Sequence, residues 1–312
     1  MLKSARNAHS ALILITMYRY QLDKSSKKFR CPNCHKKRFV RYIDVETGGY
    51  LPIEYGRCDR EINCGYFRKY IPEGRNFKNL NEIPSDIYKL PNYHPYSLVA
   101  ESFNTIEKNQ FLKFLKQKLG QEATQRIIQN YKIGNAPFWY NGTIFWQIDE
   151  RLNVHGGKII RYGADGKRFG KLNWIHSYLK YQKKIENFNL EQCLFGLHLV
   201  KENDKPVAIV ESEKTACVMS HYYPKYLWMA TGSLNGLNRK KLLPIRDRRI
   251  ILYPDTGVPF KLKNKTPFEQ WEIICLELRV EGFDIEISQL LEQNATVEQK
   301  RKGYDLADFF LV

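Results

Sequence analysis

The chain has 312 residues, with 50 Lys and Arg against 33 Asp and Glu, and a formal net charge of +17. Hydrophobic residues make up 43% of the sequence, which excludes a disordered protein, and the length favours two or three domains. The positive surplus favours a polyanionic partner, because each Lys or Arg near a phosphate can release a counterion. A merely basic protein would have the same composition.

Residues 1–28 are expected to be an N-terminal extension. The apolar run ALILITM is too short for a signal peptide and no A-x-A cleavage site follows it. Met17 offers a second start, so the first sixteen residues are either an upstream extension or a frayed arm. No stretch of 18 apolar residues occurs, so we expect no membrane span. Seven cysteines, an odd number with four clustered, favour a reducing cytoplasm over a secreted disulfide framework.

Residues 29–72 are expected to form a zinc β-ribbon. Cys31 and Cys34 form a C-x2-C pair, and Cys58 and Cys64 form a C-x5-C pair, among strand-like runs such as RFVRYIDV. Four thiolates suit tetrahedral Zn²⁺, which can contribute the folding energy that so short a segment lacks. The alternative is four ordinary buried or reactive thiols.

Basic and aromatic residues alternate between the two cysteine pairs. This interleaving suits single-stranded nucleic acid, through attraction to the backbone and stacking of bases on rings. A ribbon that packs its aromatic residues and exposes a solvated basic face fits equally well. The basic candidates for nucleic-acid binding are Lys36, Lys37, Arg38 and Arg41.

Residues 73–204 are expected to be a linker followed by a basic, mixed α+β region. The spacing of apolar residues predicts a helix over 106–119 that ends at Gly120, and a second helix in QEATQRIIQNYKIG. Asn141-Gly142 and Asp165-Gly166 predict hairpin turns. Lysine and arginine residues cluster around the second turn and are candidates for contacts to a nucleic-acid backbone; the alternative is a solvated basic face. These candidates are Lys158, Arg161, Lys167, Arg168 and Lys171.

Strands alternate with helices over residues 205–312. The runs KPVAIVES, YLWMATGS, RRIILYPDTG and FDIEIS are strand-like, and EKTACVMSHYY and TPFEQWEIICLELRVEG are helical. This alternation predicts a parallel α/β sheet. The expected fold class is therefore α/β, or α+β over the whole chain: a zinc β-ribbon, a mixed basic middle region and a C-terminal parallel sheet.

Two of these strands end in carboxylates, Glu211 and Asp255. Function gathers at the carboxyl ends of parallel strands, and neighbouring carboxylates there can share magnesium. Asp305 and Asp308, in KGYDLADFF, form a further acidic pair. We expect all four to be ligands of Mg²⁺ or Mn²⁺. The alternatives are an acid at a helix N-terminus for Glu211 and a turn residue before Gly257 for Asp255.

VESEKTA resembles the glutamate motif of Toprim domains, the metal-binding α/β fold shared by bacterial primases, topoisomerases and some nucleases. The form V-E-G-E-K-x-A of phage and plasmid primases has Gly where this chain has Ser212. The resemblance implies that Glu211 is a catalytic acid or base, beside Asp255. The second motif, normally Asp-x-Asp, lacks one carboxylate here because it reads Asp255-Thr256-Gly257. Lys214 could contact a phosphate, although a solvated helix lysine is the simpler interpretation.

The order of zinc ribbon, basic middle and Toprim resembles a primase-like family carried on bacterial mobile elements and phages, over nearly the whole chain from Met17. ERLNVHGGKIIRYGADGKR and CLFGLHL are similar to its basic segment. The resemblance implies a bacterial cytoplasmic protein of DNA replication that binds single-stranded DNA and nucleotides, with a separate replicative helicase as a further partner. Two alternatives stay open: a non-catalytic replication or mobilisation accessory protein with a degenerate Toprim domain, and a Toprim nuclease.

Overall fold

The computed structural model describes residues 19–25, 27–60, 64–68, 70, 90–260 and 265–311. The apolar run 11–17 and the polar stretch 71–86 lie outside these residues. Two compact units divide the chain: Met1–Pro84 with Pro259–Asn264, and Ser85–Val258 with Lys265–Val312. No helix in the described part of the chain is both long and apolar enough to cross a lipid bilayer.

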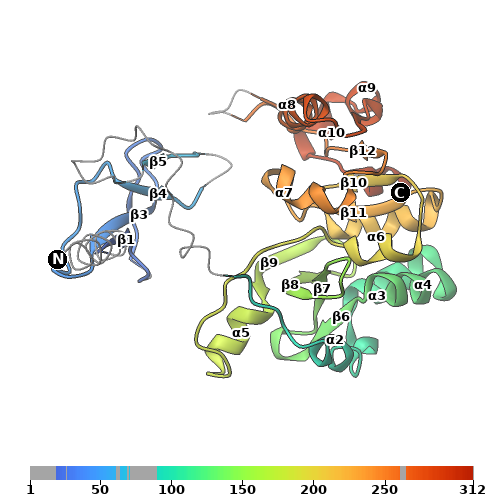
Figure 1. Ribbon diagram of the computed structural model, residues 1–312, viewed down its shortest axis with the longest axis horizontal. Helices are drawn as coiled ribbons and strands as arrows, with labels where there is room; N and C mark the ends of the chain where they lie inside the picture. The colour runs from blue at the N-terminus through green and yellow to red at the C-terminus, as the bar shows by residue number, and fades with distance from the viewer. Residues whose placement is uncertain are drawn as a thin grey trace, which may run out of the picture. The chain divides into compact units, whose positions relative to one another are not determined.

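The smaller unit is an antiparallel sheet in the order β1-β3-β4-β5, with β2 also paired to β3 (Figure 1). Tyr20–Leu22, within the expected N-terminal extension, pairs with Tyr42–Asp44 and so belongs to this sheet. Phe39 is fully buried against the cysteines, which form the small core of the unit. The strands are β1 (Tyr20–Leu22), β2 (Phe29–Arg30), β3 (Lys37–Asp44), β4 (Gly56–Cys58) and β5 (Phe67–Arg68).

The larger unit begins with helices that lead into an antiparallel sheet. The predicted first helix is confirmed from Gln110 onward as α3, which starts where the Asn109 side chain accepts a hydrogen bond from the Leu112 amide and ends at Gly120. Residues Ile106–Lys108, at the start of the predicted span, form a separate 3-10 helix, η2. The hairpin predicted at Asp165-Gly166 joins β8 and β9, whereas Asn141-Gly142 ends a longer connection, through η3, between the paired strands β6 and β7; the sheet order is β6-β7-β8-β9. The elements are α2 (Ser97–Glu101), η2 (Ile106–Lys108), α3 (Gln110–Leu119), α4 (Gln121–Tyr131), β6 (Gly134–Ala136), η3 (Pro137–Trp139), β7 (Gly142–Ile148), β8 (Val154–Tyr162), β9 (Arg168–Trp174), α5 (Ile175–Tyr181) and η4 (Leu197–Glu202).

The predicted parallel α/β sheet is also confirmed. Its four strands run in the order β11-β10-β12-β13, and each neighbouring pair is parallel. Thr266 and Glu269 form a capping box at the start of the long helix α8. The elements are β10 (Val207–Val210), α6 (Glu213–Tyr222), β11 (Leu227–Ala230), η5 (Leu234–Gly236), α7 (Arg239–Leu242), η6 (Leu243–Ile245), β12 (Ile250–Leu252), α8 (Pro267–Val280), β13 (Ile285–Ile287), α9 (Leu290–Asn294), α10 (Val297–Lys302) and α11 (Leu306–Phe310).

One hydrophobic core joins the two sheets of the larger unit. Phe111 and Phe145 from the antiparallel half and Val210 and Trp228 from the parallel half belong to the same buried cluster. The buried Tyr131 hydroxyl of α4 donates a 2.9 Å hydrogen bond to the Trp228 carbonyl of β11. The domain boundary expected between residues 204 and 205 therefore lies inside a single compact unit. The antiparallel sheet β6-β7-β8-β9 packs against the parallel α/β layer through this shared core.

Candidate metal centre and acidic site

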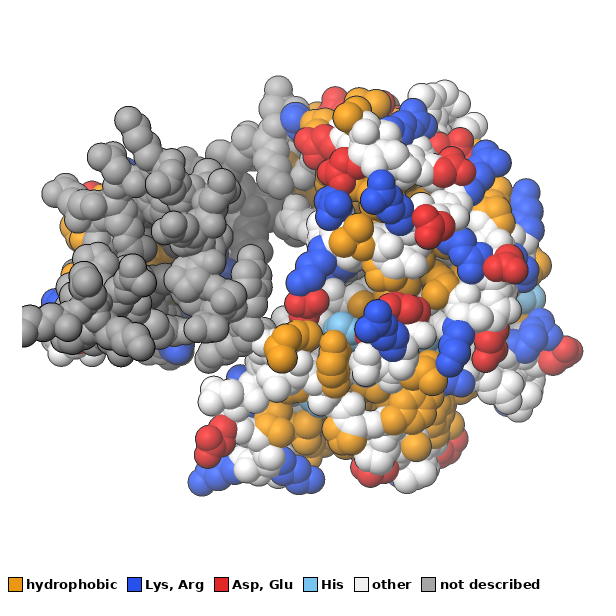
Figure 2. Space-filling view, in the orientation of Figure 1, with side chains coloured by type: hydrophobic (Ala, Val, Ile, Leu, Met, Phe, Trp, Pro, Cys, Tyr) orange, Lys and Arg blue, Asp and Glu red, His pale blue; other side chains and the backbone are white. Residues whose placement is uncertain are grey.

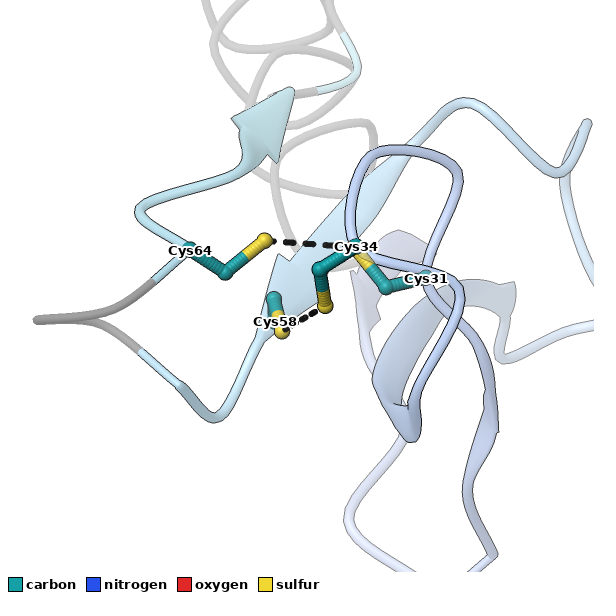
Figure 3. A group of neighbouring side chains, drawn as sticks. All are labelled: Cys31, Cys34, Cys58 and Cys64. Carbon is teal, nitrogen blue, oxygen red and sulfur yellow. Dashed lines mark hydrogen bonds between the residues drawn. The ribbon is translucent and has the colours of Figure 1, made fainter. Parts of the chain in front are cut away.

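The four cysteines of the ribbon meet at one point (Figure 3). The Sγ atoms of Cys31 and Cys64 are 3.5 Å apart, those of Cys34 and Cys58 are 3.8 Å apart, and all four sulfurs lie within 4.8 Å of one another. Tetrahedral zinc with Zn–S bonds of about 2.3 Å places its sulfurs about 3.8 Å apart. The cysteine cluster therefore fits a structural zinc ion, as the spacing of the cysteines predicts.

The backbone around the first pair forms the turn that a metal knuckle requires. The His35 amide donates to the Cys31 carbonyl and the Cys31 amide donates to the Lys36 carbonyl, both at 2.9 Å. The Lys36 amide lowers the pKa of Cys34 to about 6, whereas burial raises the pKa of Cys58 to about 12. The Cys58 thiol is therefore neutral at physiological pH without a cation, and metal binding there would release its proton.

The basic residues of the ribbon differ in their surroundings. Lys36, Lys37 and Arg38 are exposed beside the cysteine cluster. The guanidinium carbon of Arg41 lies 5.1 Å from the ring centre of Phe29 and 5.2 Å from that of Tyr50, and the group also donates to the Leu51 carbonyl. Lys36, Lys37 and Arg38 are thus accessible to an anionic ligand, whereas Arg41 also packs against the ribbon.

Glu211 and Asp255 lie at the carboxyl ends of the neighbouring parallel strands β10 and β12. Burial raises the pKa of Glu211 to about 7; the backbone amide of Asp255 opposes this shift and the charge of Asp305 adds to it. Burial raises the pKa of Asp255 well above its usual range, and the charges of Glu211 and Asp305 raise it further. Glu211 Oε1 is buried and has no hydrogen-bond partner among the described residues. The positive charges of Arg168, near Glu211, and of Lys214, near Asp255, oppose these shifts without cancelling them.

Asp305 and Asp308 join the same site from the far end of the chain. They cap α11 reciprocally: each side chain accepts a hydrogen bond from the backbone amide of the other. Asp305 also accepts from the Thr215 hydroxyl of α6 at 2.7 Å, and the Lys214 ammonium lies 3.4 Å from Asp308. Lys214 is thus paired with a carboxylate, so a phosphate would have to compete for it.

The acidic site (Glu211, Asp255, Asp305 and Asp308) is wider than the cysteine cluster. In the part of the chain that the structure describes, the cysteines are the only group of three or more potential metal ligands whose ligand atoms all lie within 4.8 Å of one another. Magnesium often uses only one or two protein carboxylates and completes its shell with water and substrate phosphates. Oxygen donors with an unpaired buried atom fit such a hard cation.

The basic hairpin separates into two environments. Lys158 is only 6% exposed, and its ammonium donates to both Glu213 oxygens, at 3.0 and 3.1 Å, and to the Gly232 carbonyl at 2.7 Å. This burial argues against Lys158 as a contact to a nucleic-acid backbone; it ties β8 to α6 and to the loop after β11. Glu213 was not identified from the sequence as the partner of Lys158, although it is the second glutamate of the VESEKTA motif.

Four predicted bases of this region stay at the surface. Lys167, Arg168 and Lys171 are exposed and Arg161 is half-buried. The charge of Arg168 lowers the pKa of Glu211, so this arginine lies within electrostatic range of the acidic site. On the face of the larger unit shown in Figure 2, Lys and Arg side chains are interspersed with Asp and Glu and do not form one continuous stripe. This face therefore offers no continuous basic track for a polyanion.

Two family models match parts of the chain. A zinc beta-ribbon finger model matches residues 18–79, and the model of a domain of unknown function (DUF6371) matches residues 109–256. The first agrees with the cysteine cluster and begins just before β1. Comparison with curated proteins gives no match.

Solved primase structures resemble the chain at low identity. The DnaG primase catalytic domain bound to ssDNA has 14% identity and a TM-score of 0.42, over 64% of this chain and 73% of that one. The zinc-binding and RNA polymerase domains of Aquifex aeolicus primase have 13% identity and a TM-score of 0.38, over 96% of this chain and 78% of that one. The RNA polymerase domain of Mycobacterium tuberculosis DnaG in complex with double-stranded DNA has 12% identity and a TM-score of 0.36, over 50% of this chain. The match spans 60% of the length of that domain.

Proposed function

We propose that this protein is a primase-like nucleic-acid-binding enzyme whose C-terminal sheet is a Toprim-type metal site. The observation that carries the proposal is the buried, unpartnered Oε1 of Glu211 at the end of β10, beside Asp255 at the end of β12. A carboxylate held in this way costs folding free energy unless a cation or a proton balances it. Buried, unbalanced carboxylates of this kind are most often found where the charge serves binding or catalysis.

Bound Mg²⁺ or Mn²⁺ would neutralise phosphate charge at this site during phosphoryl or nucleotidyl transfer. Glu211 and Asp255 would hold the ion, and Asp305 and Asp308 would extend the negative field around it. With a pKa of about 7, Glu211 can also gain or lose a proton near neutral pH, as a general acid or base must. Arg168, whose charge lowers the pKa of Glu211, would attract a phosphate toward the carboxylates.

The zinc ribbon supports the nucleic-acid part of the proposal. Exposed Lys36, Lys37 and Arg38 next to a rigid metal knuckle suit the backbone of single-stranded DNA. The net charge of +17 favours such a polyanion at long range. We therefore propose single-stranded template and nucleoside triphosphates as the ligands.

A second candidate is a non-catalytic DNA-binding accessory protein. The motif Asp255-Thr256-Gly257 supplies a single carboxylate, and Gly257, at the position of the second aspartate, has no side chain to replace the missing one. This candidate requires salt-sensitive binding to single strands that Glu211→Gln and Asp255→Asn leave unchanged.

Primer synthesis on single-stranded DNA with NTPs and Mg²⁺ or Mn²⁺ tests the proposal. We expect product with the wild-type chain and with Glu277→Gln, an exposed control acid on α8, and at least a hundredfold less with Glu211→Gln, the order of effect of losing one electrostatic catalytic group. No product from the wild type at high enzyme, with DNA binding intact, supports the accessory protein. Shortening of a labelled template indicates a nuclease instead.

A further inference from the structure

Two exposed aromatic rings and an arginine form a cluster on the antiparallel sheet. The guanidinium carbon of Arg161 lies 4.4 Å from the ring centre of Tyr140 and 4.4 Å from that of Phe169. Tyr140 is 72% exposed and Phe169 is 47% exposed. Neighbouring large aromatic side chains that stay exposed to solvent are typical of binding surfaces.

The backbone presents this aromatic–arginine cluster (Tyr140, Arg161 and Phe169) in a fixed arrangement. Arg161 is directly paired with Phe169 across β8 and β9. Tyr140 has a φ of +55°, a left-handed conformation that bulky residues rarely adopt, and Asn141 follows with +54°. The Asn135 amide holds this turn by donating to Asn141 Oδ1 at 3.2 Å. A turn that places a tyrosine in this way, outside the core, points to a role for the ring at the surface.

The cation of the cluster is itself incompletely bonded. Arg161 Nε is buried without a hydrogen-bond partner among the described residues, and the guanidinium lies against the two rings. Each ring uses one face for the guanidinium and, given its exposure, keeps further surface open to a flat ligand. The hairpin turn and the adjoining strand β9 carry Lys167, Arg168 and Lys171 against the single carboxylate of Asp165. A ligand with flat rings and negative charges, such as a nucleotide strand, would match both the exposed rings and the cations.

We propose that the aromatic–arginine cluster is a base-stacking platform for single-stranded DNA. Bases stack on Tyr140 and Phe169, Arg161 supports both rings from within, and the neighbouring cations meet the phosphates. A duplex hides its base faces in its own stack, so the platform selects single strands. The proposal rests on the proposed nucleic-acid function and names the part of the surface that distinguishes bases from backbone.

The test measures fluorescence anisotropy of the full chain with labelled oligothymidylate and with an abasic oligonucleotide of the same length, which keeps the phosphates and removes the bases. We expect the wild type to bind the abasic strand roughly tenfold more weakly or worse, because stacking contributes about one to two decades of affinity per base. We expect Tyr140→Ala and Phe169→Ala each to weaken oligothymidylate binding by a similar factor and to leave abasic binding and the salt dependence unchanged. Tyr181→Ala, an exposed tyrosine at the end of α5, is the matched control.

Equal wild-type affinity for the two strands overturns the platform and leaves the proposed function standing; this comparison needs no variant, so a misfolded mutant cannot obscure it. Binding of Tyr140→Ala and Phe169→Ala that matches Tyr181→Ala also overturns it, and would assign the exposed rings to a protein partner or to no ligand. No binding of any single strand by the wild type removes the proposed function and the platform together.

Discussion

Replacing Glu211 with glutamine should stabilise the metal-free protein. The substitution keeps the shape of the side chain and an oxygen that can accept from the Asp255 amide, and it removes a charge that burial disfavours. It also removes one of the charges that raise the pKa of Asp255. An acid that merely complements the positive end of an ordinary helix would have the opposite effect on loss of its charge.

The magnitude follows from the displaced pKa. Burial and neighbouring charge move the pKa of Glu211 from 4.5 to about 7. One pKa unit corresponds to about 1.4 kcal/mol, so the ionised carboxylate costs on the order of 3 kcal/mol above neutral pH. Because the side chain keeps some access to solvent, we expect a gain of roughly 1–3 kcal/mol for Glu211→Gln, which raises Tm by about 2–4 °C per kcal/mol.

Thermal unfolding of the wild type, Glu211→Gln and the control Glu277→Gln, each across a pH series with chelator present, measures this effect. The folded state holds the Glu211 proton more tightly than the unfolded chain, so the protonated side chain stabilises fully below about pH 4.5 and that stabilisation is lost as the pH rises through about 7. The wild type should therefore lose stability over this window relative to Glu211→Gln. Added Mg²⁺ should stabilise the wild type at pH 8 and leave the variant unchanged.

A lower Tm for Glu211→Gln than for wild type at pH 8 in chelator would refute this reasoning, because it would show that the charge stabilises the fold. Equal responses of the two proteins to Mg²⁺ would refute the metal assignment alone. The two results are independent, since one concerns the cost of the charge and the other its ligand.

Further predictions concern the other charged and metal-binding groups. Cys64→Ser should reduce bound zinc and make the ribbon protease-sensitive, as metal analysis and limited proteolysis will show; full zinc retention would contradict the four-thiolate site. Lys158→Met should destabilise the larger unit by about 3–5 kcal/mol in urea titration by leaving buried Glu213 unpaired, and Glu213→Gln added to it should recover a substantial part; no loss would mean that the pair is unimportant. Asp255→Asn should abolish stabilisation by Mg²⁺ in the same melting assay, and an unchanged response would exclude Asp255 as a ligand.

Local patterns in the sequence determined the elements of this fold. The strand–helix alternation after residue 205 predicts the parallel sheet, because buried apolar runs joined by helices pack in that way. Asn109 and Gly120 mark the ends of α3, since capping depends on residues adjacent in the chain. The two cysteine pairs likewise indicate a metal site without knowledge of any long-range contact.

The acidic site was only partly accessible to such reasoning. That Glu211 and Asp255 would meet follows from the rule that parallel strands share a carboxyl edge. That Thr215 would hold Asp305, or that Lys214 would pair with Asp308, depends on how α11 packs against α6, which no local pattern specifies.

The basic hairpin shows the same division most clearly. In the sequence, Lys158, Arg161 and Arg168 are three similar cations near one turn. Alternation along β8 places Lys158 and Arg161 on opposite faces of the sheet, but it cannot say which face another layer will cover. The α/β layer covers the face of Lys158, so this lysine is buried against Glu213 and Arg161 is left beside two exposed rings. The sequence by itself determined the strands and their charges, and only the packing of the two sheets decided which charge holds the fold together and which remains available to a ligand.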